Sequence, residues 1–83
     1  MSKVLVEVVV PAADTKFDIY VPLDVRMSEV KSLITGIVSD LTEGKFVGDE
    51  NSVLCDFETG IIFNINMIVF DLGIKNGSKL MLI

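Results

Sequence analysis

The spacing of hydrophobic residues changes once along the chain, and this change limits the folds that the sequence can adopt. Residues 3–10 and 16–22 alternate with a period of two, which is typical of β-strands with one buried face. Residues 27–41 carry apolar side chains every three or four positions, which predicts one amphipathic helix. The connection 11–15 contains Pro11 and Asp14, so the two strands are expected to form an antiparallel hairpin.

The second half of the chain is predicted to return to strands after a polar loop. Short apolar runs bounded by glycine, asparagine and acidic residues are typical of strands joined by turns. The expected elements are a third strand at 53–57, a turn at 58–60, a short fourth strand at 61–64, a helical turn at 67–72, a turn at Asn76-Gly77 and a last strand at 78–83. The predicted order is therefore ββαβββ in a single domain, residues 1–83.

The inward face of the third strand has two interpretations. Simple alternation places Val53, Cys55 and Phe57 on the inside, whereas a bulge would turn Leu54 inward instead. The sequence leaves both open.

The ends of the main helix also have candidate signals. Asp24 or Ser28 is expected to cap its start, and Asn66 the start of the later helical turn. Gly44 stands where a left-handed residue would end the main helix.

Composition excludes several classes of function. The net charge of −5 would repel phosphate groups, so nucleic-acid binding is not expected. No apolar run approaches the roughly 20 residues of a membrane span, so direct membrane insertion is not expected either. The N-terminus, Met-Ser-Lys-Val-Leu-Val-Glu, lacks the pattern of a signal peptide, which predicts a cytoplasmic protein.

Few residues are suited to catalysis or metal binding. The chain has no histidine, and its single cysteine, Cys55, lies next to Asp56, which would raise the thiol pKa. We therefore expect Cys55 to be a small buried side chain rather than a nucleophile. The acid pairs 49–50 and 56/58 are expected to be solvated rather than to bind a metal. No enzyme activity and no cofactor are predicted.

The most informative feature is an apolar surface, because one helix can cover only one face of the sheet. The outward positions of the predicted strands are expected to form a protein-binding site. Its residues are Leu5, Val9, Tyr20, Met81 and Ile83, and its polar rim is Lys3, Glu7, Asp18 and Lys79. The alternatives are that the loop after the helix partly covers this face, or that the face is buried in a homodimer.

The order of elements resembles the β-grasp, or ubiquitin-like, superfamily. Segment 69–83, in which a short helical turn leads into the last strand, and the helix start at 27–31 carry the resemblance. The pattern Asp-x-Gly-Ile-x-Asn-Gly-x-x-Leu at 71–80 is similar to the YukD-like proteins of bacterial type VII (WXG100/ESAT-6-like) secretion systems. This resemblance implies an α+β fold with a mixed sheet of four to five strands and one helix packed across it.

The same resemblance implies a function. It predicts a non-catalytic adaptor that binds proteins through the open sheet face, with membrane subunits or the ATPase of a type VII secretion system as partners. The chain ends at Ile83 without the Gly-Gly tail of ubiquitin, so conjugation and sulfur transfer are not expected. The alternatives are a modifier or sulfur carrier that lacks its tail, and a ubiquitin-like domain cut from a larger secretion subunit.

Overall fold

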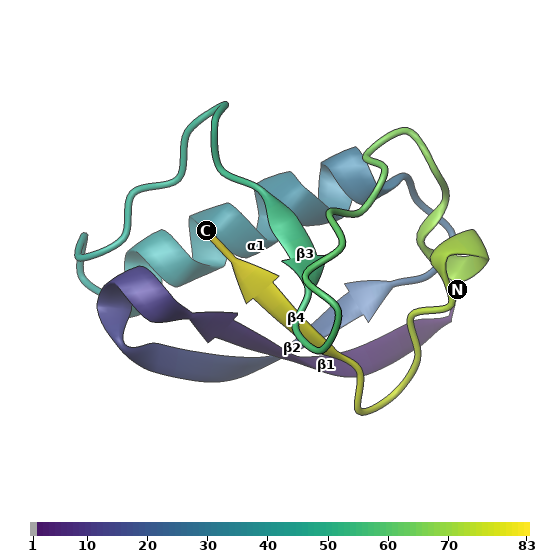
Figure 1. Cartoon of the computed structure of the whole chain (residues 1–83), viewed down its shortest axis with the longest axis horizontal. Helices are drawn as coiled ribbons and strands as arrows, with labels where there is room; N and C mark the ends of the chain where they lie inside the picture. The colour runs from purple at the N-terminus through teal and green to yellow at the C-terminus, as the bar shows by residue number, and fades with distance from the viewer. Residues whose placement is uncertain (1) are drawn as a thin grey trace.

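The order of the strands in the sheet explains how the two halves of the chain combine. The computed structural model describes residues 2–83 and contains one four-stranded sheet, ordered β2-β1-β4-β3, with one long helix beside it (Figure 1). The elements are β1 (Lys3–Val10), η1 (Pro11–Ala13), β2 (Thr15–Pro22), α1 (Met27–Leu41), β3 (Leu54–Asp56), η2 (Val69–Leu72) and β4 (Lys79–Leu82).

The sheet is mixed. β1 pairs with β2 in an antiparallel hairpin, as predicted, and pairs with β4 in parallel on its other side. β3 pairs with β4 in an antiparallel arrangement. A parallel pair needs a long crossover connection, and the segment that contains α1 supplies it. The predicted α+β architecture, with one helix on a mixed sheet, is confirmed.

The core lies between α1 and one face of the sheet. Alternate residues of β1 point into it, and the helix contributes a stripe at three- and four-residue spacing, both as the sequence predicts. The members with no exposed surface include Val6, Val8, Val10, Val21, Met27, Ile34, Val38, Val69, Leu80 and Leu82. This packing leaves the opposite face of the sheet without a helix.

The expected fourth strand at 61–64 is wrong. Residues 61–63 make only an isolated bridge to β3, in which Asp56 N–H donates to the Ile61 carbonyl and Phe63 N–H donates to the Leu54 carbonyl. The chain then turns away, because the carbonyls of Ile65 and Met67 accept hydrogen bonds from the first helical N–H groups. The sheet therefore has four strands.

The expected caps at the helix start are also wrong. Within residues 2–83, no N-cap side chain hydrogen-bonds to the start of α1 or of η2. Ser28 N–H donates to the Ile65 carbonyl at 2.9 Å and Met27 N–H to the Met67 carbonyl at 2.8 Å, so backbone groups satisfy the unpaired donors of the first turn. At the other end, Gly44 adopts the expected left-handed conformation, and its N–H donates to the Ser39 carbonyl at 3.0 Å.

No helix within residues 2–83 combines the length and the apolar character that crossing a bilayer requires.

A candidate docking face on the sheet

Four of the five predicted site residues lie on strand positions that point away from α1, and the fifth lies directly after a strand. Leu5 and Tyr20 are direct neighbours on β1 and β2, and Val9 and Met81 are direct neighbours on β1 and β4. Ile83 follows β4 two positions after Met81 and is half exposed. The sequence also allowed the loop after α1 to cover part of this face. Phe46 of that loop packs instead in the core, on the helix side of the sheet.

A charged row divides these residues into two groups. Glu7 lies opposite Asp18 on one side and Lys79 on the other, between the Leu5–Tyr20 pair and the Val9–Met81 pair. The Lys16 Nζ is 3.2 Å from a Glu7 carboxylate oxygen, and the Lys79 Nζ is 3.9 Å from the other oxygen. The predicted residues therefore do not form one continuous apolar patch.

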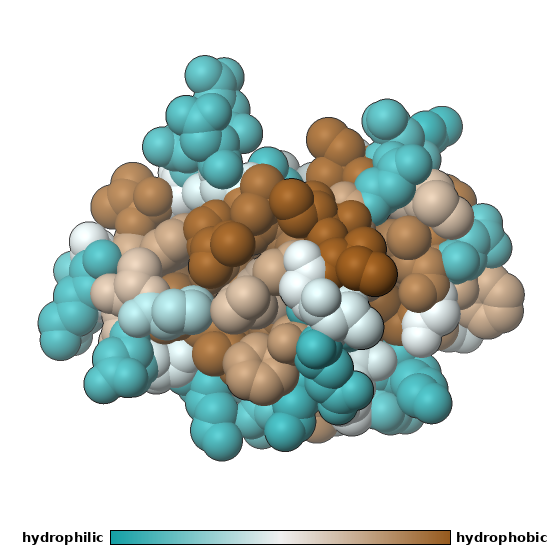
Figure 2. All heavy atoms as spheres, viewed as in Figure 1, coloured by the Kyte–Doolittle hydropathy of each residue, from teal (hydrophilic) through white to brown (hydrophobic). Residues whose placement is uncertain are grey.

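A continuous apolar line does run across the sheet on one side of this charged row. Val9 lies opposite Met81, Met81 lies opposite Cys55, and Cys55 lies opposite Ile62 in the isolated bridge. Val53 and Ile83, which exchange two backbone hydrogen bonds, lie next to this line. We call these six residues the apolar band: Val9, Val53, Cys55, Ile62, Met81 and Ile83. Figure 2 shows hydrophobic side chains gathered over β3 and β4 on the face that carries it.

The register of β3 decides between the two interpretations of its faces. Leu54 lies opposite Leu82 and belongs to the core, so the interpretation with Leu54 inward is correct. The three paired residues of β3 form a regular ladder, and no bulge is needed. Val53 and Cys55 consequently belong to the outward face.

Sequence reasoning missed Ile62 and Val53 as members of this surface. The turn at 58–60 contained the necessary signal, because a hairpin around it places Ile62 opposite Cys55. Once Leu54 is assigned to the core, alternation places Val53 outward with Cys55. The sequence alone did not decide which residues of the third strand point inward, and this prevented both conclusions.

Cys55 is the one band member that is fully covered, with 1% of its surface exposed. Its Sγ lies 3.6 Å from the Met81 carbonyl, within reach of a weak S–H hydrogen bond. Burial raises the pKa of the Cys55 thiol, and the negative charge of Asp56 raises it further. The thiol is therefore neutral near pH 7, as expected for a packing residue.

The raised pKa of Cys55 predicts a pH effect on stability. A thiol that holds its proton more tightly in the folded state stabilises that state below its ordinary pKa of 9.0, and this contribution is lost as the pH rises through the higher folded value. The difference in free energy of unfolding between the wild type and Cys55→Ala should be constant below pH 9.0 and should shrink above it. Urea unfolding at a series of pH values measures this difference. A difference that stays flat or grows would show that the pKa is not raised.

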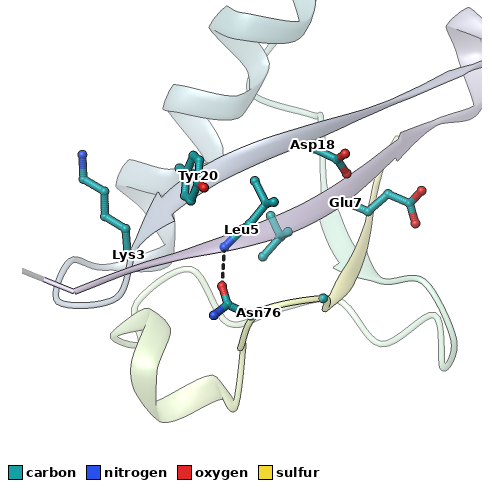
Figure 3. Close-up of a pocket in the computed structure, with 8 residues that line it drawn as sticks. Lys3, Leu5, Glu7, Asp18, Tyr20 and Asn76 are labelled. Atoms are coloured by element: carbon teal, nitrogen blue, oxygen red, sulfur yellow. Dashed lines mark hydrogen bonds between the residues drawn. The ribbon is translucent and has the colours of Figure 1, made fainter.

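The Leu5–Tyr20 pair borders a shallow hollow on the other side of the charged row (Figure 3). Leu5 N–H donates to the Asn76 Oδ1 at 2.8 Å, and Gly77 N–H donates to the Leu5 carbonyl. The Asn76-Gly77 turn thus extends the pairing between β1 and the segment before β4. These bonds fix the backbone of Leu5, which lines the hollow. The Tyr20 side chain, which also lines it, is 64% exposed.

One acid of each predicted pair accepts hydrogen bonds within a turn. The Asp56 Oδ2 accepts hydrogen bonds from the N–H and the hydroxyl of Thr59, both at 2.9 Å. The Asp49 Oδ1 accepts a hydrogen bond from Asn51 N–H at 2.8 Å. Within residues 2–83, no three histidine, cysteine or acidic side chains gather in a way that could hold a metal ion.

Solved structures match the whole chain. The ubiquitin-like domain of the Mycobacterium tuberculosis type VII secretion system protein EccD1 matches with a TM-score of 0.79 and 16% identity, covering 100% of this chain and 99% of that one. The EccD5 ubiquitin-like domain from Mycobacterium xenopi gives a TM-score of 0.82 and 16% identity, covering 100% and 94%. A chain from a toluene 4-monooxygenase complex gives a TM-score of 0.80 and 12% identity, covering 98% and 96%.

No protein-family profile matches this sequence, and no curated protein matches it. Identities of 12–16% with near-complete coverage establish a shared architecture rather than a shared activity. The chain has the ubiquitin-like β-grasp fold.

Proposed function

We propose that this chain is a non-catalytic protein-interaction module that binds partners reversibly through the apolar band. The observation that carries the proposal is the continuous line from Val9 through Met81 and Cys55 to Ile62, on a face that no helix of residues 2–83 covers. Ile62 and Ile83 are 60% and 50% exposed, so burial by a partner would remove a large apolar area from water. The charged row at Glu7 and Lys79 borders the band and provides the polar rim that reversible interfaces have.

We further propose that the partners belong to a type VII secretion system, and that the protein acts as a cytoplasmic accessory component of the YukD-like kind. Two of the matching structures are ubiquitin-like domains of type VII secretion proteins, EccD1 and EccD5. The motif at 71–80 independently resembles the YukD-like proteins of these systems. Since a chain of a toluene 4-monooxygenase complex has the same fold, the fold alone does not select the partner. The candidates are membrane subunits and the ATPase of the secretion machine.

A second candidate is a ubiquitin-like domain within a larger secretion subunit. The two EccD matches favour it, because both are described as domains, and this chain covers 99% and 94% of them. In that case the apolar band would bind another part of the same assembly. An immunoblot of the host with an antibody against residues 2–83 separates the two candidates. A detected protein of about 9.1 kDa supports the free adaptor, and a detected protein of much larger mass supports the domain.

Affinity capture from the host tests the proposed function. The tagged protein is expected to recover a type VII membrane subunit or the ATPase, and its own mass under denaturing conditions should be unchanged, because the association is not covalent. A host strain that lacks the secretion genes is the matched control. If the main proteins captured from the wild-type host are also captured from that strain, they are not secretion components, and this result would contradict the secretion role. A ladder of covalent adducts would show that the protein is a modifier.

A further inference from the structure

The outer edge of β2 carries unpaired backbone groups. β2 is an edge strand whose only partner in the sheet is β1. Leu5 and Glu7 direct their backbone hydrogen bonds toward the β4 side of β1, as the bonds to Asn76, Gly77 and Ser78 show. In an antiparallel ladder their partners on β2 must then point their own N–H and C=O groups outward.

These outward groups belong to Lys16, Asp18 and Tyr20, which lie opposite Val9, Glu7 and Leu5. Within residues 2–83, β1 is the only strand beside β2, and these groups face away from it, so they have no backbone partner there. β2 runs for eight residues, and its single proline, Pro22, stands at the end of the strand. A long edge without a bulge or an internal proline is ready to accept another strand. Figure 3 shows Asp18 and Tyr20 on this outermost strand.

We propose that two copies of this chain pair through β2, antiparallel and centred on Phe17, to form a continuous eight-stranded sheet. In this register, Lys16 of each copy lies opposite Asp18 of the other. Both residues have outward backbone groups, so the two pairs form four backbone hydrogen bonds. The inference is independent of the proposed docking function, because the apolar band lies mainly on β4, β3 and residue 62 and stays open.

Charge complementarity selects both the second copy and its register. Lys16 already has Glu7 as an ion-pair partner, so a strand that pairs here needs above all a base opposite Asp18. β2 itself supplies that base in Lys16, and the same register places an acid opposite each Lys16. Centring the pair on Asp18 would place two carboxylates opposite each other, and centring it on Lys16 would place two ammonium groups together. Centring it on Ile19 would place Pro22, which has no N–H, opposite Lys16. Among the described residues Asp18 has no ion pair of its own, so it is available to a partner.

The helix side of the edge fits the same arrangement. Phe17 is partly exposed and lies on the helix side of β2, beside a hollow that is also lined by Ala13 and Leu41. Leu41 is 55% exposed. In the proposed register the two Phe17 side chains meet across the two-fold axis, where opposite residues come closest. They would shield part of this apolar surface from water.

Charge-reversal variants test the register. Lys16→Asp places two acids opposite each other at each contact, and Asp18→Lys places two bases there, so each variant should weaken dimerisation at least about 10-fold. A 1:1 mixture of the two variants restores opposite charges at both contacts, and the mixture should therefore form a heterodimer close to wild-type affinity. Lys3→Asp, a charge reversal on the same face away from the outward edge groups, should leave dimerisation unchanged.

Sedimentation velocity over a range of concentrations, up to about 0.5 mM because small interfaces bind weakly, measures these effects. Circular dichroism checks that each variant is folded. A wild-type dimer, two weakened variants and recovery in the mixture would support the proposal. A monomeric wild type over the whole range would overturn it, and so would dimerisation that neither variant weakens or a mixture that fails to recover.

Discussion

Replacing Leu80 with alanine is expected to lower the free energy of unfolding by about 2–5 kcal/mol, the usual cost of emptying a fully buried leucine site. Leu80 has no exposed surface, lies opposite Val8 and Asp56 in the sheet, and belongs to the core beneath α1. Its neighbour Met81 points to the other face. Met81→Ala is the matched control and should cost less than about 1.5 kcal/mol, because its site is open on one side and loses fewer contacts.

Urea unfolding of the two alanine variants and the wild type measures this pair of effects. The comparison is sensitive to the register of β4, because a shift by one residue would exchange the faces of Leu80 and Met81. Equal losses, or a larger loss at Met81, would contradict the assignment of the helix-covered face.

Replacing Ile62 with aspartate is expected to weaken partner binding by at least about 10-fold, which corresponds to about 1.4 kcal/mol. Ile62 is 60% exposed at the end of the apolar band, so the folded protein should tolerate the change. In a complex, the new carboxylate would be buried against an apolar surface without a charged partner, and this desolvation is costly. The loss should appear in the dissociation rate, as is usual when a buried contact is removed.

Val47→Asp is the matched control for this prediction. Val47 is a branched aliphatic residue, 73% exposed, in the loop between α1 and β3 and outside the band. Calorimetric titration of the captured secretion subunit should give the wild-type affinity for Val47→Asp and a weakened affinity for Ile62→Asp. Equal affinity for both variants would place the binding site elsewhere on the molecule.

The long strands and the helix could be predicted because apolar residues recur in them at regular spacing. The alternation in 3–10 and 16–22 and the three- and four-residue spacing in 27–41 reflect which side chains enter the core. The structure buries the expected valines of β1 and most of the helix stripe, whereas Leu33 and Leu41, at its edges, are exposed. The last strand and the turn at Asn76-Gly77 carried equally clear signals.

The segment 53–68 was harder because its backbone is determined by distant partners. A three-residue strand carries too few positions for alternation to choose between Leu54 and Cys55 as the inward residue. Residues 61–63 have the composition of a strand, yet the next carbonyls are needed at the start of α1, more than 35 positions earlier in the chain. No local pattern reports such a requirement.

The candidate surface was predicted only in part, because its layout also depends on contacts between residues far apart in the sequence. Alternation placed the five expected residues on the outward face, but it did not show that Glu7, Asp18 and Lys79 line up as a row between them. That arrangement depends on how β1 is aligned with both of its neighbours. The same alignment brings Cys55 and Ile62 into line with Val9 and Met81, which makes the apolar band.

The central claim is that the apolar band is the docking surface. Its most direct test is to map, by nuclear magnetic resonance, the surface of this protein that the partner contacts. The ¹⁵N-labelled protein is titrated with the unlabelled captured subunit, and the changes in amide signals are assigned to residues. The largest changes are expected at Val9, Met81, Cys55 and Ile62, with little effect on the hollow lined by Leu23, Ile68 and Phe70. Changes concentrated at that hollow or along the exposed side of α1, with the band unaffected, would contradict the account.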